Sequence, residues 1–169
     1  MKIVLIGDLK GHGKTTFAKE LKKQLKLKSE ILSFAGPLKE HYKERTGVDF
    51  DRLSDKDDGR KAIHELAGIL KKDYGQNVFV NIAMSSAVSM YPNYAIIDDL
   101  RCDFELLEVA KAFSSDLISI RVRRKEKAVE IGTHETEKGV KESLYDSLIE
   151  VMENGVEYAV AEFIEEFGL

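Results

Sequence analysis

The sequence predicts an α/β fold in which helices cover both faces of a parallel sheet. Two observations predict it: apolar strand-like segments alternate with amphipathic helix-like segments from the first residues onward, and a glycine-rich turn follows the first strand. The 169 residues, 43% of them hydrophobic, suffice for one well-buried core. We therefore expect a single domain over residues 1–169.

The first half of the chain repeats the order strand, turn, helix. We expect strands at residues 2–6 and 31–34, separated by a helix whose apolar residues recur at a four-residue spacing. These residues are Phe17, Leu21 and Leu25. A second helix begins at Gly36-Pro37, because proline is well tolerated at the first helical position. Segment 47–59 is charged and poor in apolar residues, which favours an exposed loop.

The second half contains further strands and helices. Its expected helices cover residues 60–70, 77–90 and 156–167, and its expected strands are residues 94–97, 117–122 and 148–152. The first two of these helices should cover the sheet or a pocket. Segment 125–139 is polar and mixed in charge, which is typical of a mobile flap.

Composition excludes several classes of function. With 26 basic and 30 acidic side chains the formal net charge is -4, so no global basic field attracts nucleic acid or an anionic membrane. The single cysteine, Cys102, cannot form an intramolecular disulfide, and one cysteine also argues against a structural zinc site. No segment approaches the length of a membrane span. We expect a cytoplasmic protein.

The most informative motif is the turn between the first strand and the first helix, Gly7-Asp8-Leu9-Lys10-Gly11-His12-Gly13-Lys14-Thr15-Thr16. In this context it predicts a phosphate-binding P-loop, whose backbone N–H groups and helix N-terminus face an anion. Lys14 would reach the β- and γ-phosphates of ATP, and the Thr15 hydroxyl would bind Mg²⁺. The residues expected to contact ATP are Gly11, His12, Gly13, Lys14, Thr15 and Thr16.

The loop departs from the standard pattern at one position. Asp8 stands where the first glycine of Gly-x-x-x-x-Gly-Lys-Ser/Thr is expected, and Gly7 comes one residue too early. Aspartate tolerates unusual backbone angles, so the shape of the loop can survive. Its carboxylate would repel a triphosphate unless it points away or meets a cation.

Charged residues follow two later strands. Asp98 and Asp99 end the strand at 94–97, where a carboxylate can bind Mg²⁺ or cap the next helix. In the strand at 117–122, Arg121 and Arg123 should face one side and Arg124 the other. Arginines and a flap are what a small-molecule kinase needs to neutralise phosphates and exclude water. The Asn-Lys-x-Asp motif of GTPases is missing from the sequence.

Several segments together resemble the bacteriophage-type deoxynucleoside monophosphate kinases, of the P-loop nucleoside monophosphate kinase superfamily. They are Ser33-Phe34-Ala35-Gly36-Pro37-Leu38-Lys39, Arg60 to Gly68, Asp98-Asp99-Leu100-Arg101 with Glu105, His134-Glu135-Thr136-Glu137 and Glu153-Asn154-Gly155. The resemblance spans almost the whole chain. Dephospho-coenzyme A kinases share several of these segments.

The resemblance implies a P-loop kinase fold: a five-stranded parallel sheet flanked by helices, a helical monophosphate-binding insertion at about 36–90 and a lid at about 125–139. It implies ATP and Mg²⁺ as cofactors. The implied catalytic residues are Lys14, Asp99, Arg101, Arg123 and Arg124. The implied acceptor contacts are Phe34, Lys39, Arg60 and Arg101, and the implied metal ligands are Thr15, Asp98 and Asp99.

The leading hypothesis is therefore a phosphotransferase of deoxynucleotide metabolism that phosphorylates a (deoxy)nucleoside monophosphate. One alternative is another small-molecule kinase, such as a dephospho-coenzyme A kinase, and another is a nucleotide-binding regulatory protein with weak turnover. The expected partners are small-molecule nucleotides, without nucleic acid or membrane, and the chain is expected to be a monomer or a homodimer.

Overall fold

In the computed structural model, which describes residues 1–9, 11–49, 56–126 and 139–169, five parallel strands form one sheet in the order β2-β3-β1-β4-β5. The strands are β1 (Lys2–Gly7), β2 (Ser29–Leu32), β3 (Tyr94–Leu100), β4 (Leu117–Arg124) and β5 (Ser147–Val151). The helices are α1 (Lys14–Gln24), α2 (Gly36–Thr46), α3 (Lys56–Tyr74), α4 (Val78–Met90), α5 (Asp103–Phe113), the short 3₁₀ helix η3 (Glu142–Leu144) and α6 (Val156–Phe167). The predicted sheet is confirmed.

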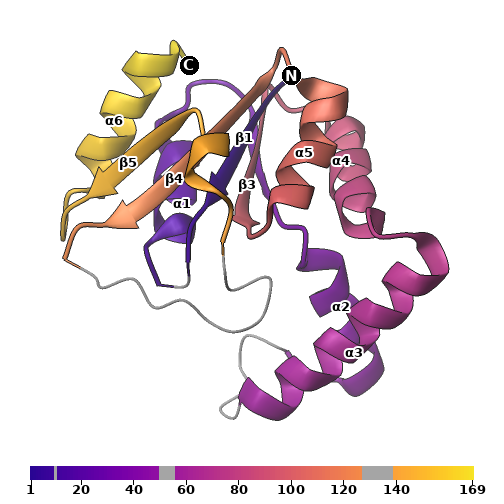
Figure 1. Ribbon diagram of the computed structural model, residues 1–169. Helices are drawn as coiled ribbons and strands as arrows, with labels where there is room; N and C mark the ends of the chain where they lie inside the picture. Colours follow the sequence, from indigo (N-terminus) through magenta and orange to yellow (C-terminus); the bar gives the residue numbers. More distant parts are fainter. Residues whose placement is uncertain (10, 50–55, 127–138) are drawn as a thin grey trace.

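Alternation along the central strand β1 builds two cores. Val4 and Ile6 are fully buried in a cluster with residues of α1 and α6, whereas Ile3 and Leu5 are fully buried in a cluster with residues of α4 and α5. The sheet therefore lies between two helical layers (Figure 1). Burial on both faces explains why β1 is apolar at every position from Ile3 to Ile6.

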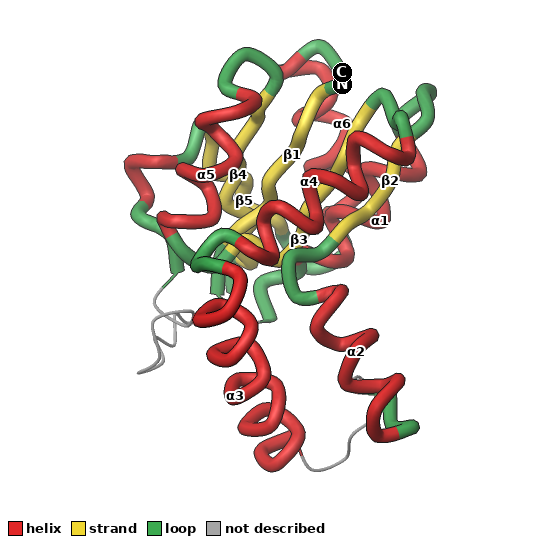
Figure 2. The backbone as a smooth tube through the Cα atoms, turned by 90° about the vertical axis from the view of Figure 1, so that its right-hand side faces the viewer, coloured by secondary structure: helices red, strands yellow, loops and turns green. Residues whose placement is uncertain are grey.

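Two helices leave this sandwich. Figure 2 shows α2 and α3 extending together beyond the end of the sheet at which the strands finish, whereas α4 returns along the sheet. Of the two helices that we expected to cover the sheet or a pocket, α4 covers the sheet and α3 extends away from it. The pair α2 and α3 lies within the predicted insertion at 36–90.

Three predicted boundaries need correction. β2 begins at Ser29 and ends at Leu32, two residues earlier than expected, and β3 continues through the two acids to Leu100. α3 begins at Lys56, so the loop predicted for 47–59 is wrong over its last residues. A charged, apolar-poor composition does not distinguish an exposed helix from an exposed loop.

Most of the predicted lid, residues 127–138, lies outside the described residues, so the lid stays a prediction. Within the part of the chain that the structure describes, no helix has the length and apolar character needed to cross a membrane.

Candidate phosphate-transfer site

The loop between β1 and α1 has the backbone of an anion-binding turn. Gly11 and Gly13 have φ angles of 82° and 90°, in the region where glycine is favoured. Gly13 is also the N-cap of α1, which makes no side-chain capping hydrogen bond and has no acidic residue in its first turn. The N-terminus of α1 therefore carries no side-chain cap, and the helix dipole favours an anion there.

Lys14 lies at the centre of this turn. Its Nζ donates hydrogen bonds to the carbonyl oxygens of Asp8 and Leu9, at 2.6 and 2.7 Å. Burial lowers the pKa of Lys14 to about 8, and the positive charge of Arg101 adds to this decrease. Arg101, exposed at the end of β3, is therefore close enough to repel Lys14. A lysine at an uncapped helix N-terminus, with a second cation near enough to lower its pKa, is a combination suited to phosphate.

Asp98 belongs to the same group of residues. It is half-buried near the end of β3, and burial raises the pKa of its carboxyl, while a hydrogen bond with the Thr15 side chain opposes that shift and the charge of Asp99 adds to it. A carboxylate beside a hydroxyl is a ligand pair that fits Mg²⁺, which binds few protein oxygens and completes its shell with phosphate and water. Among the described residues, no cluster of three or more acidic, histidine or cysteine side chains could hold a metal by itself.

Asp99 points the other way, as expected for the next residue of a strand. Its carboxylate accepts hydrogen bonds from Ser33 Oγ at 2.6 Å, from the Phe34 N–H at 2.8 Å and from the Ala35 N–H at 3.0 Å. These donors form the turn between β2 and α2. Asp99 thus holds the start of α2 against β3. We predicted this carboxylate as a metal ligand and catalytic group, and in the structure three hydrogen bonds to the turn occupy it.

Basic residues of β4 lie beside the loop. Arg121 and Arg123 each place Nε within 3.5 Å of an oxygen of Asp8, which confirms that they share one side of the strand. Asp8 therefore meets cations, one of the alternatives left open by the sequence. Arg124 lies nearer to α1: its Nε is 3.9 Å from the point that a β-carbon on Gly13 would occupy.

Four other predicted residues fall in different surroundings. His12 is 1% exposed beside Asp8, so its side chain is buried within the loop, and its contact with ATP stays a prediction. Phe34 is 3% exposed within the core between the sheet and α4, and its assignment as an acceptor contact stays a prediction. Lys39 is half-buried on α2. Arg60 lies in α3, and its side chain is outside the described part of the chain.

The sequence analysis missed the contact made by Tyr145, and it named Glu105 without giving it a role. Tyr145 packs its ring on Gly7 at the start of the loop. The Glu105 carboxylate accepts hydrogen bonds from the N–H groups of Arg101 and Cys102, at 2.8 and 3.3 Å, and caps α5. The position of Gly7, one residue before the expected glycine, was a sign of the contact with Tyr145. The Cys102-x-x-Glu105 spacing was a sign that Glu105 caps α5.

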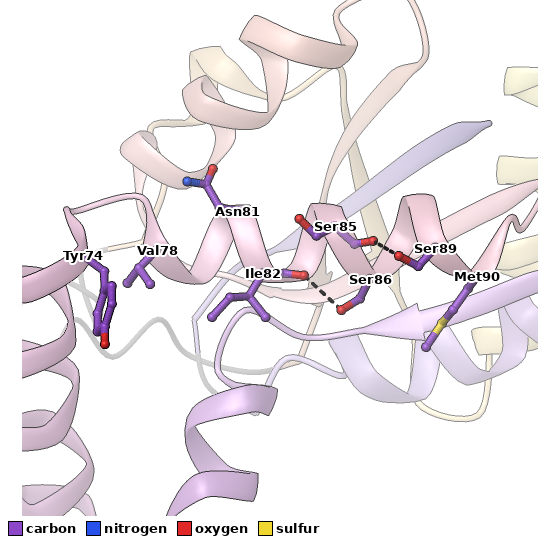
Figure 3. Close-up of a pocket in the computed structure, with 8 residues that line it drawn as sticks. All are labelled: Tyr74, Val78, Asn81, Ile82, Ser85, Ser86, Ser89 and Met90. Carbon is purple, nitrogen blue, oxygen red and sulfur yellow. Dashed lines mark hydrogen bonds between the residues drawn. The ribbon is translucent and has the colours of Figure 1, made fainter.

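A separate hollow of about 490 Å³ follows the outer face of α4. Figure 3 shows Tyr74 and Val78 at one end and Met90 at the other, with three serines between them. No residue of the phosphate loop lines it, and α4 has no charged side chain. This hollow therefore lacks the chemistry to bind a phosphate, and we keep the nucleotide site at the loop.

Neither a family model nor a curated protein matches the chain. A presumed kinase from Chloroflexus aurantiacus matches with a TM-score of 0.52 and 12% identity, over 99% of this chain and 96% of its own. Shikimate kinases from Aquifex aeolicus and Bacteroides thetaiotaomicron match with a TM-score of 0.49, at 18% and 13% identity, over 99% of this chain and 96% and 99% of theirs. At such identities only the fold is comparable, and it is the P-loop kinase fold.

Proposed function

We propose that the protein transfers the terminal phosphoryl group of ATP to a nucleoside monophosphate, with a deoxynucleotide as the preferred acceptor. One observation supports this most strongly: Lys14 follows the uncapped N-cap of α1, its Nζ bonds the carbonyls of the loop, and Thr15 hydrogen-bonds Asp98 beside it. A fold shared with a presumed kinase agrees with phosphoryl transfer in general.

Each residue has a distinct task in this proposal. The N–H groups of Gly11 to Thr16 bind the phosphates of ATP, and the charge of Lys14 stabilises the transferring group. Thr15 and Asp98 hold Mg²⁺, which when bound neutralises charge on the phosphate oxygens. Arg124, at the other side of the loop, adds a second positive charge from β4.

The acceptor would lie between the loop and the pair α2 and α3. Arg101 is exposed directly after the end of β3, and Asp99 fixes the turn from which α2 departs. The resemblance to deoxynucleoside monophosphate kinases assigns Lys39 and Arg60 to the acceptor as well. We retain both as proposed contacts, in addition to Arg101.

Other acceptors would use the same phosphate machinery, because acceptor specificity depends on few side chains. A dephospho-coenzyme A kinase and a regulatory protein with weak turnover are accordingly the alternatives. Three further expectations stay predictions: a cytoplasmic location, no nucleic-acid or membrane partner, and a monomeric or dimeric state.

A coupled ADP-release assay tests the proposal. The panel contains ATP with each of the common ribo- and deoxyribonucleoside monophosphates and with dephospho-coenzyme A, and an acceptor-free reaction gives the background. We expect a deoxynucleoside monophosphate to give the highest rate, and Lys14→Ala to reduce it by at least about a hundredfold. Lys19→Ala, an exposed lysine of the same helix, is the matched control and should keep the rate.

Rates at the acceptor-free level across the panel would contradict the kinase proposal and favour the regulatory alternative. A rate that depends only on dephospho-coenzyme A would select that acceptor instead. Near-normal turnover of Lys14→Ala would contradict the role of the loop.

A further inference from the structure

Asp8 occupies an unusual position in the phosphate loop. Its φ angle is 147°, in a region that residues with a side chain rarely adopt, and its side chain is 1% exposed. Backbone strain and a buried carboxylate both cost stability, and they persist only where surrounding contacts compensate.

Those contacts come mainly from β4. One carboxylate oxygen of Asp8 accepts a hydrogen bond from the Leu9 N–H at 2.7 Å and lies 3.3 Å from both Nε and Nη2 of Arg121. The second oxygen lies 3.5 Å from Nε of Arg123 and 3.9 Å from Nδ1 of His12. The side chains of Arg121 and Arg123 are only 13% and 24% exposed, so water screens these pairs weakly.

The sheet register brings these groups together. The strands β1 and β4 run side by side (Figure 1). Gly7 is the register partner of Arg121, so Asp8, the next residue, leaves β1 beside the last residues of β4. Arg121 also donates from Nη1 to Glu142 at 2.6 Å and thereby connects the loop to η3. One carboxylate in the loop thus joins two arginines of the neighbouring strand.

We infer that Asp8 is a positioning residue: it fastens the phosphate loop to β4 by neutralising Arg121 and Arg123. The inference rests on the proposed function only for its consequence for catalysis: Arg121 and Arg123 pair with Asp8 and therefore do not bind the phosphates of the substrates. Of the cations discussed above, all within the described residues, Lys14, Arg101 and Arg124 are then the ones left to bind phosphates. Asp8 substitutes for the usual glycine because its charge holds the loop, although glycine would fit the backbone better.

A thermal-unfolding cycle tests the charge pairing without any nucleotide. Asp8→Asn keeps the size of the side chain and the strained backbone, but it removes the acidic partner of Arg123 and leaves Arg121 with Glu142 alone. We expect the melting temperature to fall by about 5–10 °C. In a background with both Arg121→Met and Arg123→Met, the same change should alter the melting temperature by less than about 2 °C. Equal losses in the two backgrounds would overturn the inference.

Asp8→Gly provides a second test that does not depend on the arginine-free background folding. It relieves the backbone strain and removes the charge together. We expect a melting temperature below that of the wild type but above that of Asp8→Asn. A protein more stable than the wild type would mean that strain dominates and that the ion pairs do not hold the loop.

Kinetics then distinguish positioning from a simple loss of stability. The loop N–H groups bind the phosphates in the ground state and the transition state alike, so a displaced loop should raise KM for ATP by about tenfold and change kcat by less than about threefold. A lower kcat at unchanged KM would indicate only a smaller folded fraction and would overturn the positioning role. If the wild type turns over no acceptor, ATP affinity measured by calorimetry replaces KM, so failure of the proposed function is recognised separately.

Discussion

The ring of Tyr145 packs directly on Gly7, with Cζ 2.8 Å and Cε1 2.9 Å from the point that a β-carbon on residue 7 would occupy. No side chain fits there unless the ring moves. This contact explains why a glycine precedes the position at which the P-loop pattern expects one. Gly7 is required by packing against the chain that leads into β5, and phosphate binding does not require it.

Gly7→Ala should therefore destabilise the protein. Forcing a methyl group against the Tyr145 ring should reduce the free energy of unfolding by about 1–3 kcal/mol. Gly68→Ala is the matched control, because a β-carbon there meets no atom within 4 Å and alanine is the better helix former. Urea denaturation of both variants checks the prediction. Equal stability of Gly7→Ala and the wild type would mean that the ring is easily displaced.

Removing the Tyr145 hydroxyl should not harm the fold. That oxygen is buried, and the described residues offer it no hydrogen-bond partner. Tyr145→Phe should keep the packing on Gly7 and increase the free energy of unfolding by about 1 kcal/mol, since a buried unsatisfied hydroxyl costs stability. The measurement is the same urea denaturation. A clear loss of stability would instead reveal a partner for the hydroxyl.

Activity should decline in alkaline solution. Lys14 stabilises phosphate only when protonated, and its pKa in the free protein is about 8. A plot of kcat/KM for ATP against pH should fall above about pH 8, because this ratio reports groups of the free enzyme. Lys14→Arg should be slower but should lack this alkaline limb, since arginine stays charged. A limb retained in Lys14→Arg would assign it to another group.

Arg101 should shift the same limb. Its positive charge is one of the causes that lower the pKa of Lys14, second to burial. Arg101→Ala should consequently move the alkaline limb to higher pH while it weakens acceptor binding. Arg45→Ala, at the end of α2, serves as the control and should leave the limb in place. An unmoved limb in Arg101→Ala would place Arg101 away from the lysine.

The pKa of Lys14 also predicts a pH dependence of stability. Its value falls from 10.5 to about 8 on folding, so between these values the unfolded chain binds more protons than the folded one. Linkage then makes the contribution of Lys14 to stability rise with pH across that window, whereas the charged lysine costs stability below it. Lys14→Met should be more stable than the wild type near about pH 7, and the difference should shrink by about pH 10. A difference that is constant with pH would contradict this.

The two adjacent acids should respond differently to substitution. Asp99→Asn removes the charge that accepts three hydrogen bonds from the β2–α2 turn, so the free energy of unfolding should fall by about 1–3 kcal/mol. Asp98→Asn removes a carboxylate that burial disfavours, so the protein without nucleotide should become more stable, while Mg²⁺-dependent turnover should fall by about a hundredfold. Denaturation and ADP release measure the two effects. The reverse pattern would exchange their roles.

The sequence by itself determined the local features of this protein. Apolar runs and four-residue spacings located all five strands and the helix after the loop, because the periods of strand and helix are properties of short segments. The glycines, Lys14 and Thr15 located the candidate phosphate site, since their spacing is typical of a backbone that curls around an anion.

Only the tertiary structure decided which residues become partners. Asp98 and Asp99 are equivalent in sequence, yet strand alternation turns one toward α1 and the other toward the turn before α2. Asp8 could have repelled phosphate, and the register of β1 with β4 gave it two arginines instead. Tyr145 reaches Gly7 because β5 lies beside β4 in the sheet. Hydrogen bonds and ion pairs act over a few ångströms, so partners far apart in the chain are fixed only once the sheet order and register bring them together.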